Sequence, residues 1–233
     1  MKQTVPPTQA ILYWQQHSGL DLRVEQLGEL RTLLINGQCQ SQFQLQQPGE
    51  VFYPHLQVVL DFLAQQPWQQ LLQFGLGGGE LNRACQARWP ERQLTTVEAI
   101  PEIITLYQQF FSVDLPTGEA ETPAPAPLII QADAGQFCAT ARAKGTKYDA
   151  IFIDVYPFPE LWEPLLRNCA ALLHDAGWLL VNVPLAQLPA NFTEVCQLLD
   201  PAWRKQAIPG YANQLVFIQP SRSTTEHKVV QGS

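Results

Sequence analysis

Two features of the sequence combine residue types and spacing that suit the binding of a nucleoside. The first is the glycine-rich stretch 75–79 (Gly-Leu-Gly-Gly-Gly), which stands between a short apolar run and a helical pattern. Glycines permit a sharp turn and the close approach of a ligand, and a helix start behind them presents unpaired N–H groups. The second is Glu98, which closes the next apolar run and can hold both hydroxyls of a ribose. Together they predict a nucleoside site at the carboxyl end of a parallel sheet.

The glycine spacing distinguishes between candidate nucleotides. Gly75, Gly77 and Gly79 give G-x-G-x-G, whereas a dinucleotide fingerprint requires G-x-G-x-x-G. The sixth position is Glu80, whose carboxylate would repel a pyrophosphate, and no Gly-Lys-Ser/Thr follows, which excludes a P-loop. An adenosyl sulfonium is cationic and tolerates nearby acids, so the pattern favours S-adenosylmethionine or a relative. The alternative is that the glycines only form a turn.

Composition narrows the class of protein. The chain has 233 residues, 46% of them hydrophobic and 15% charged, with a net charge of −7. These values indicate a folded protein and argue against general binding to nucleic acid or an anionic membrane. Five scattered cysteines without a C-x-x-C pair indicate free thiols of a reducing compartment. No signal peptide, membrane-spanning run or metal-ligand spacing is apparent, so we expect a cytoplasmic protein without a metal.

Hydrophobic patterns predict a small antiparallel sheet followed by an α/β domain. In the first part we expect a short helix over 10–17 and strands over 20–26, 30–36 and 39–45, the last two joined at Asn36-Gly37. A helix over 54–65 precedes the glycine-rich stretch. Beyond it, helices alternate with strands as far as a final pair of strands, 203–208 and 214–218. This order predicts a doubly wound, mostly parallel seven-stranded sheet with an antiparallel edge.

We divide the chain into three parts on this basis. Residues 1–50 form the N-terminal β-hairpin extension, 51–220 the nucleoside-binding domain, and 221–233 a polar tail. The stretch 114–127, rich in Pro, Glu, Thr and Ala, is expected to be a long loop.

Several motifs, in order along the chain, resemble the spermidine synthase family of the class I S-adenosylmethionine-dependent methyltransferase superfamily. The stretch 34–40 is similar to the family's L-x-D/N-G-x-x-Q hairpin, and 74–83 to its I-G-G-G-D-G-G-x-x-R loop and helix. The stretches 97–101, 132–134 and 148–154 are similar to its V-E-I-D-P, G-D-A/G and Y-D-V-I-I-x-D motifs. The resemblance extends from about residue 33 to residue 183 and implies a class I methyltransferase-like Rossmann fold.

The resemblance also implies roles for individual residues. Asp154 would be the catalytic acid that faces the sulfonium beside the incoming amine, and Glu98 would hold the ribose. From the residues alone, Asp133 is equally well explained as the N-cap of a helix. The resemblance would let His55 reach the cleft, and the alternative for His55 is a helix-start contact. The positions implied for the cofactor are Gly75, Gly77, Gly79, Glu98, Asp133, Ala134 and Gln40, and those for the substrate are Tyr53 and Tyr156.

The sequence departs from the family at three acidic positions. The loop acid that would pair with the aminopropyl amine falls at Gly78, the second acid of a D-x-x-D segment at Pro157, and a His-Glu pair is replaced by Pro54 and His55. A diamine carries a charge at each end, and burying either charge without a carboxylate costs several kcal/mol. Putrescine is therefore a doubtful acceptor unless another acid takes over; the candidates are Glu80, Glu160 and Glu163.

We therefore expect a transferase that binds S-adenosylmethionine or its decarboxylated form and moves a methyl or aminopropyl group to an amine. In-line displacement needs mainly proximity and orientation, with Asp154 accepting a proton or steering the cation. The missing acid at Gly78 favours methyl transfer. A methyltransferase of a different small acceptor and a non-catalytic adenosyl-binding homologue remain open, and a nicotinamide oxidoreductase would have to bind NAD. The resemblance further implies a homodimer.

Overall fold

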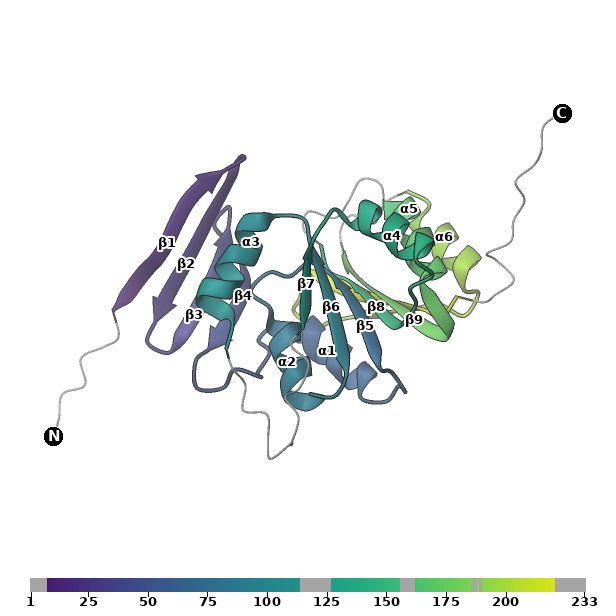
Figure 1. Ribbon diagram of the computed structural model, residues 1–233, viewed down its shortest axis with the longest axis horizontal. Helices are drawn as coiled ribbons and strands as arrows, with labels where there is room; N and C mark the ends of the chain where they lie inside the picture. Colours follow the sequence, from purple (N-terminus) through teal and green to yellow (C-terminus); the bar gives the residue numbers. More distant parts are fainter. Residues whose placement is uncertain (1–7, 114–126, 156–161, 186–187, 189, 221–233) are drawn as a thin grey trace.

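The computed structural model describes residues 8–113, 127–155, 162–185, 188 and 190–220, and within them the strands form two separate sheets (Figure 1). The smaller sheet is antiparallel and takes its strands in chain order. The larger sheet has the order β10-β11-β9-β8-β5-β6-β7 and is parallel except at β10 and β11. The mostly parallel seven-stranded sheet with a small N-terminal antiparallel sheet is confirmed in the described part of the chain.

The bounds of the elements follow the chain from end to end. The smaller sheet contains β1 (Gln9–His17), β2 (Leu20–Leu27), β3 (Leu30–Ile35) and β4 (Gln38–Gln44). The larger sheet contains β5 (Gln70–Phe74), β6 (Gln93–Glu98), β7 (Leu128–Gln131), β8 (Tyr148–Ile153), β9 (Leu173–Pro184), β10 (Arg204–Ala207) and β11 (Asn213–Ile218). The helices are α1 (Pro54–Leu63), α2 (Glu80–Arg88), α3 (Pro101–Leu106), α4 (Ala134–Ala143), α5 (Trp162–Ala171) and α6 (Phe192–Leu199), and a π-helical turn, Tyr107–Phe111, extends α3.

One predicted element is wrong. The stretch 10–17 is not a helix but lies within β1, which pairs with β2 along its length. The turn between them places Ser18 at φ 49° and Gly19 at φ 82°, a conformation that matches the twist of a two-residue hairpin. Most of β1 is exposed, so the stretch has no buried apolar stripe to favour a helix. The Asn36-Gly37 turn, by contrast, joins β3 to β4 as predicted.

Helices cover both faces of the larger sheet and make three apolar cores. Helices α1 and α2 pack on one face, against buried residues such as Leu71 and Phe152. Helices α4, α5 and α6 pack on the other, around Ile151 and Leu179. The third core lies between α3 and the smaller sheet. The smaller sheet is thereby held beside the larger one (Figure 1).

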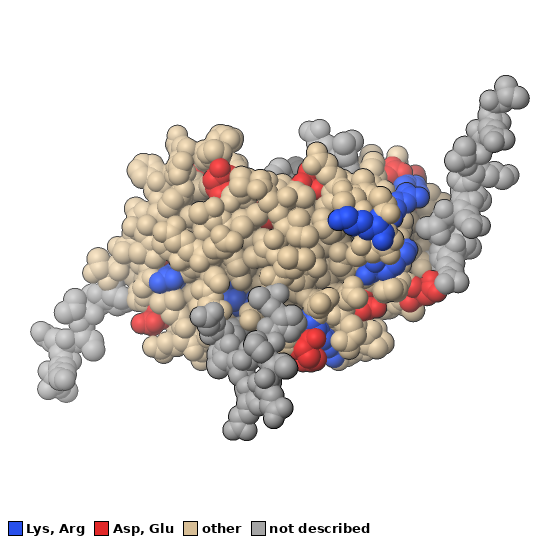
Figure 2. Space-filling model, in the orientation of Figure 1, with Lys and Arg blue, Asp and Glu red and all other residues tan. Residues whose placement is uncertain are grey.

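Charged side chains are few on the face of the molecule that Figure 2 shows. On the face shown in Figure 2, Lys and Arg side chains gather over α4 and α5 and stand near Asp and Glu. Among the described residues, no helix has the length and apolar character needed to cross a membrane.

Candidate functional site

A cavity of about 830 Å³ lies across the carboxyl ends of β6, β5, β8 and β9. From β5 the chain proceeds outward to β6 and β7, then returns to place β8 on the other side of β5. Ligands of doubly wound sheets bind at such a reversal of strand order. The cavity is also lined by residues of β4 and of the start of α1, so the N-terminal sheet contributes directly to the site.

The glycine bend between β5 and α2 needs its glycines for different reasons. Gly75 and Gly79 have positive φ angles of 90° and 71°, and a Cβ would overlap the Asp154 carbonyl at the first and the Tyr107 ring at the second. Gly77 has a φ of 54°, and a Cβ there would make only an ordinary contact, with the Gln40 carbonyl oxygen at 3.8 Å. Gly75 and Gly77 line the cavity, whereas Gly79 is absent from its lining. The bend is therefore fitted closely to β8 and to the turn after α3.

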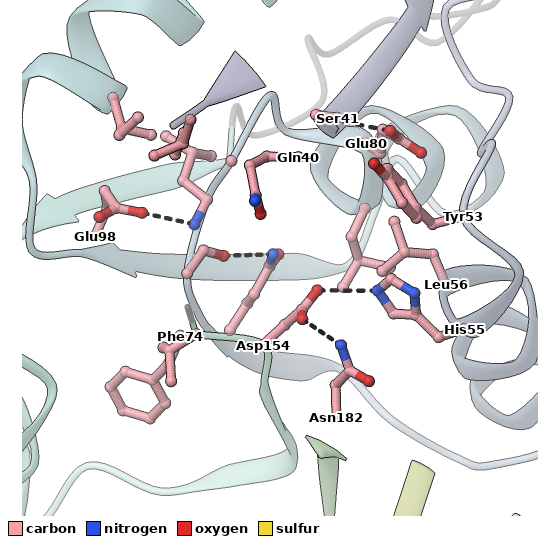
Figure 3. Close-up of a pocket in the computed structure, with 18 of the residues that line it drawn as sticks. Gln40, Ser41, Tyr53, His55, Leu56, Phe74, Glu80, Glu98, Asp154 and Asn182 are labelled. Carbon is pink, nitrogen blue, oxygen red and sulfur yellow. Dashed lines mark hydrogen bonds and ion pairs between the residues drawn. The ribbon is translucent and has the colours of Figure 1, made fainter. Parts of the chain in front are cut away.

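Glu98 points toward the glycine bend from the end of β6. Its Oε2 accepts a hydrogen bond from the Leu76 N–H at 2.9 Å and its Oε1 one from the Ile100 N–H at 2.9 Å. The side chain lines the cavity (Figure 3), and the residue is only 9% exposed, so it is not a solvated strand end. The bend and the carboxylate thus border the same open volume.

The other positions predicted for the cofactor divide into two groups. Gln40, on β4, and Ala134, at the start of α4, line the cavity. Asp133 is exposed, is not part of the lining, and caps α4 by accepting a hydrogen bond from the Gln136 N–H at 3.1 Å. Tyr156 lies outside the described residues. The ligand contacts of all these residues stay predictions.

Asp154 follows β8 and is held by two side chains at the opposite end of the cavity (Figure 3). His55 Nε2 lies 3.1 Å from its Oδ2, and Asn182 Nδ2 donates to its Oδ1 at 2.8 Å. Burial alone would raise the pKa of Asp154, but the charge and hydrogen bond of His55, with the hydrogen bond from Asn182, outweigh it and lower the pKa. The carboxylate is therefore ionised at neutral pH.

Aromatic rings form a wall beside Asp154. The His55 ring stacks on Tyr211 with centroids 5.3 Å apart and an angle of 21°, and Tyr53 lies 5.6 Å from His55 and 6.1 Å from Tyr211. The Tyr53 hydroxyl donates to the Cys39 carbonyl at 2.6 Å. Burial raises the pKa of Tyr53 and of Tyr211 above the usual value, so both phenols are neutral.

Glu80 links α2 to the N-terminal sheet by hydrogen bonds. Its carboxylate is 3% exposed and accepts three hydrogen bonds, from Ser41 Oγ at 3.0 Å, from the Gln42 N–H at 2.6 Å and from the Phe52 N–H at 2.9 Å. These donors occupy both oxygens, so Glu80 is engaged in holding the sheet. Of the other candidate replacement acids, Glu163 pairs with Arg167 at 2.9 Å outside the cavity lining, and Glu160 lies outside the described residues.

Arg83 reinforces the same connection from within the core. It is 1% exposed and donates to the carbonyls of Gly78, Phe111 and Pro48, the last two at 3.1 Å. Its guanidinium stands 4.3 Å over the Phe43 ring on β4, and burial lowers its pKa to about 10. The glycine bend and the N-terminal sheet are thereby joined as one wall of the cavity.

Gly78 has no room for the acid that the resemblance would place there. A Cβ at this position would lie 2.7 Å from both Cβ and Oγ of Ser41 and 3.2 Å from the Phe111 ring. Real Cβ contacts below 3.0 Å are essentially never seen. The close packing of the N-terminal sheet against the bend therefore leaves no space for an acidic side chain at this position.

Three residues of the site were not predicted from the sequence: Asn182, Tyr211 and Gln73, which all line the cavity. Of the two interpretations of His55, a helix-start contact and a place in the cleft, the second holds, since His55 faces Asp154 in the cavity. Asn182 and Gln73 each interrupt a buried apolar strand, and a polar residue at such a position is a usable signal. Tyr211, in the turn between β10 and β11, has no comparable sequence signal. In the described part of the chain, no group of three or more His, Cys, Asp or Glu could hold a metal ion.

Comparisons with known proteins agree on the type of fold. No family model matches the chain. In sequence it is similar to the polyamine aminopropyltransferase of Vibrio vulnificus, with 26% identity over 147 residues, 60% of this chain and 46% of the relative. That of Neisseria meningitidis serogroup A is 23% identical over 170 residues, 70% of this chain and 61% of the relative. The chain thus spans about half the length of the curated relatives it matches.

Solved structures give the same result. A probable spermidine synthase from Corynebacterium glutamicum has a TM-score of 0.72 at 17% identity, with 90% of this chain and 80% of that chain covered. A spermidine synthase in complex with the transition-state analogue AdoDATO has a TM-score of 0.62 at 14% identity, with 89% and 73% covered. Human methyltransferase-like protein 13 in complex with SAH has a TM-score of 0.59 at 20% identity, with 77% and 86% covered.

The fold of the described residues, a mostly parallel seven-stranded sheet with an N-terminal antiparallel sheet, is similar to that of the spermidine synthases. In sequence the chain is distantly similar to the polyamine aminopropyltransferases.

Proposed function

We propose that the chain binds S-adenosylmethionine or its decarboxylated form and transfers a methyl or aminopropyl group to the nitrogen of a small amine. One observation carries the proposal: the cavity joins a glycine bend and Glu98 at one end to Asp154, His55 and Asn182 at the other. A nucleoside held at the first end would extend its sulfonium toward the second, where a nucleophile can be positioned.

The donor end supports an adenosyl group. Glu98 lies next to the bend with its carboxylate already oriented by two backbone N–H groups, which leaves further lone pairs for ribose hydroxyls. Ala134 and Gln40 add cavity wall near the bend. Relatives of the same fold have been solved with SAH and with AdoDATO.

The acceptor end suggests how Asp154 would act. A carboxylate with a lowered pKa is a weak base, because efficient proton transfer needs a pKa near the working pH. It is, however, a good partner for a cation. We therefore assign Asp154 the task of binding and orienting the amine, which loses its proton to solvent before the nitrogen attacks the carbon next to sulfur. Displacement then forms the new N–C bond and leaves a neutral thioether.

Titration calorimetry tests the donor end directly. S-adenosylmethionine, decarboxylated S-adenosylmethionine and methylthioadenosine are titrated into the protein, with NAD as the control. We expect binding of at least one adenosyl ligand and none of NAD, and weaker binding to Glu98→Gln. Binding of NAD alone, or unchanged affinity in the variant, would contradict the proposed nucleoside site.

Mass spectrometry of mixtures of donor and amines then tests transfer. A new alkylated amine together with the matching thioether nucleoside supports a transferase and identifies which group moves. A second candidate, a non-catalytic adenosyl-binding protein, is favoured by one observation: Gly78 has no space for an acid that would hold an aminopropyl amine. Tight nucleoside binding with no amine consumed would favour this candidate.

Two further expectations remain proposals, a cytoplasmic location and a homodimer. Light scattering after size-exclusion chromatography measures the mass of the particle, and we expect twice that of one chain, 26.2 kDa.

A further inference from the structure

Among the described residues, a single available carboxylate sets the charge of the acceptor end. Three carboxylates line the described part of the cavity, those of Glu80, Glu98 and Asp154. Glu80 is occupied by three donors, and Glu98 lies at the other end of the cavity, beside the glycine bend. Asp154 accepts one hydrogen bond or contact on each oxygen, although a carboxylate has about four acceptor sites. Among the described residues that line the acceptor end, only Asp154 therefore offers negative charge to a ligand.

Two residues that line the cavity each carry an unpaired polar atom that requires a donor. Asn182 Oδ1 and Gln73 Oε1 are buried without a hydrogen-bond partner, and their residues, which line the cavity, are 8% and 3% exposed. Both atoms are acceptors. Asn182 donates its Nδ2 to Asp154, so its free oxygen belongs to the same group of atoms. An ammonium has three N–H donors and no acceptor, so its chemistry suits this set of atoms.

The other described residues that line the acceptor end add no further negative charge. Tyr53, Tyr211 and Leu56 line it, and both phenols stay neutral because burial raises their pKa. His55 occupies the second oxygen of Asp154 with an imidazole, which adds no negative charge. A second cationic group on the ligand would meet this ring wall without a carboxylate, and an unpaired charge removed from water is strongly disfavoured.

We propose that the acceptor is a primary amine with a single cationic group and an apolar body, and that His55 determines this preference over diamines. The inference rests on the proposed function, because it assumes that the reaction is transfer to an amine. It makes an additional claim about the substrate class: the ammonium binds Asp154 with Asn182 and Gln73, and the apolar body lies against Tyr53 and Tyr211. His55 acts as a specificity-determining residue because it stands where a second carboxylate would accommodate a second cation.

The test compares two amines of equal chain length, n-butylamine and 1,4-diaminobutane, which differ by one amino group. Each is titrated by calorimetry into the full chain saturated with methylthioadenosine, and each is offered with the donor for transfer. We expect n-butylamine to bind at least about tenfold more tightly, since the diamine must leave one charge unpaired or unbound. Equal or tighter binding of the diamine would overturn the inference, and so would failure of both amines to bind.

Two variants at one position sharpen the comparison. His55→Glu adds a carboxylate and is expected to shift the preference toward the diamine by about tenfold or more. His55→Gln, the matched control, adds no carboxylate and should keep the preference for n-butylamine, although with lower affinity for both amines. Melting curves establish that each variant is folded, and if His55→Glu is not, the wild-type comparison and His55→Gln decide. Amine binding with the expected preference but without transfer would defeat the proposed function while leaving the inference intact.

Discussion

Replacing Gly78 by alanine should destabilise the protein for a purely steric reason. Gly78 does not have a positive φ, so its backbone conformation accepts a side chain. The added Cβ would lie 2.7 Å from Ser41 Cβ, about 1 Å inside the optimal separation of two carbon atoms. Overpacking of this kind costs about 1–3 kcal/mol. For a chain of this size, about 2 kcal/mol lowers the melting temperature by roughly 4–8 °C.

A double-mutant cycle identifies Ser41 as the cause. Ser41→Gly removes the two atoms that clash, but it also removes the hydrogen bond to the Glu80 carboxylate, which costs about 1.5–3 kcal/mol. The double variant Ser41→Gly/Gly78→Ala should therefore be less destabilised than the sum of the single variants by about 1–2 kcal/mol. Urea unfolding of the four proteins measures this coupling, since both residues lie within the same folded unit.

A control separates steric cost from a general effect of replacing glycine. Gly135, at the start of α4, also lacks a positive φ, and its added Cβ would meet only Asp133 Oδ1 at 3.2 Å. Gly135→Ala should be neutral or stabilise the protein by up to about 1 kcal/mol. If Gly78→Ala melts within about 1 °C of the wild type, or if Ser41→Gly gives no coupling, the packing account of the missing acid is wrong.

Three other predictions follow from the site. Glu98→Gln turns an amide N–H₂ toward a backbone N–H, and leaving that donor unpaired should cost about 1–3 kcal/mol, measured by urea unfolding together with adenosyl binding. Asp154 has a lowered pKa in the folded protein, so its contribution to stability is present above its ordinary pKa and is lost as the pH falls through the lowered value. Unfolding measured from pH 7 to pH 2 should show this loss in the wild type and not in Asp154→Asn. Arg83→Met leaves buried carbonyls without a donor and should cost about 3 kcal/mol or more; a loss below about 1 kcal/mol in guanidinium unfolding would contradict its bracing role.

The larger sheet was predictable because its signals are local. The strand, the glycine bend, the helix start and the acid at the end of β6 occur within thirty consecutive positions, 70–98. The first strand was missed because β1 is defined by pairing with β2, and pairing depends on the partner rather than on the strand's own pattern. Its Ser18-Gly19 turn was a signal of the hairpin that sequence reasoning did not use.

The candidate site likewise contains residues that sequence motifs identified and residues that only the fold brings together. Glu98, Gln40, Tyr53 and Asp154 line one cavity, and motif order along the chain placed them there. The partners of Asp154 come from α1 and β9, far apart in the sequence. No spacing rule links such positions, because it is the fold that brings them together. The sequence could therefore indicate a site residue at 154 but not the charge environment that tunes it.

That charge environment decides between the remaining functions. Glu80 is occupied by the N-terminal sheet and Gly78 is closed by Ser41, so neither position can supply a second acid at the cavity. Within the described lining, the acceptor end is left with Asp154 and unpaired oxygens from Asn182 and Gln73. A nucleoside-binding protein without an acceptor gives no reason for unpaired acceptor atoms near an ionised carboxylate, because each buried atom without a partner costs stability. An ammonium is a donor that suits these oxygens, and for this reason we favour a transferase acting on a monoamine over a nucleoside-binding protein without an acceptor.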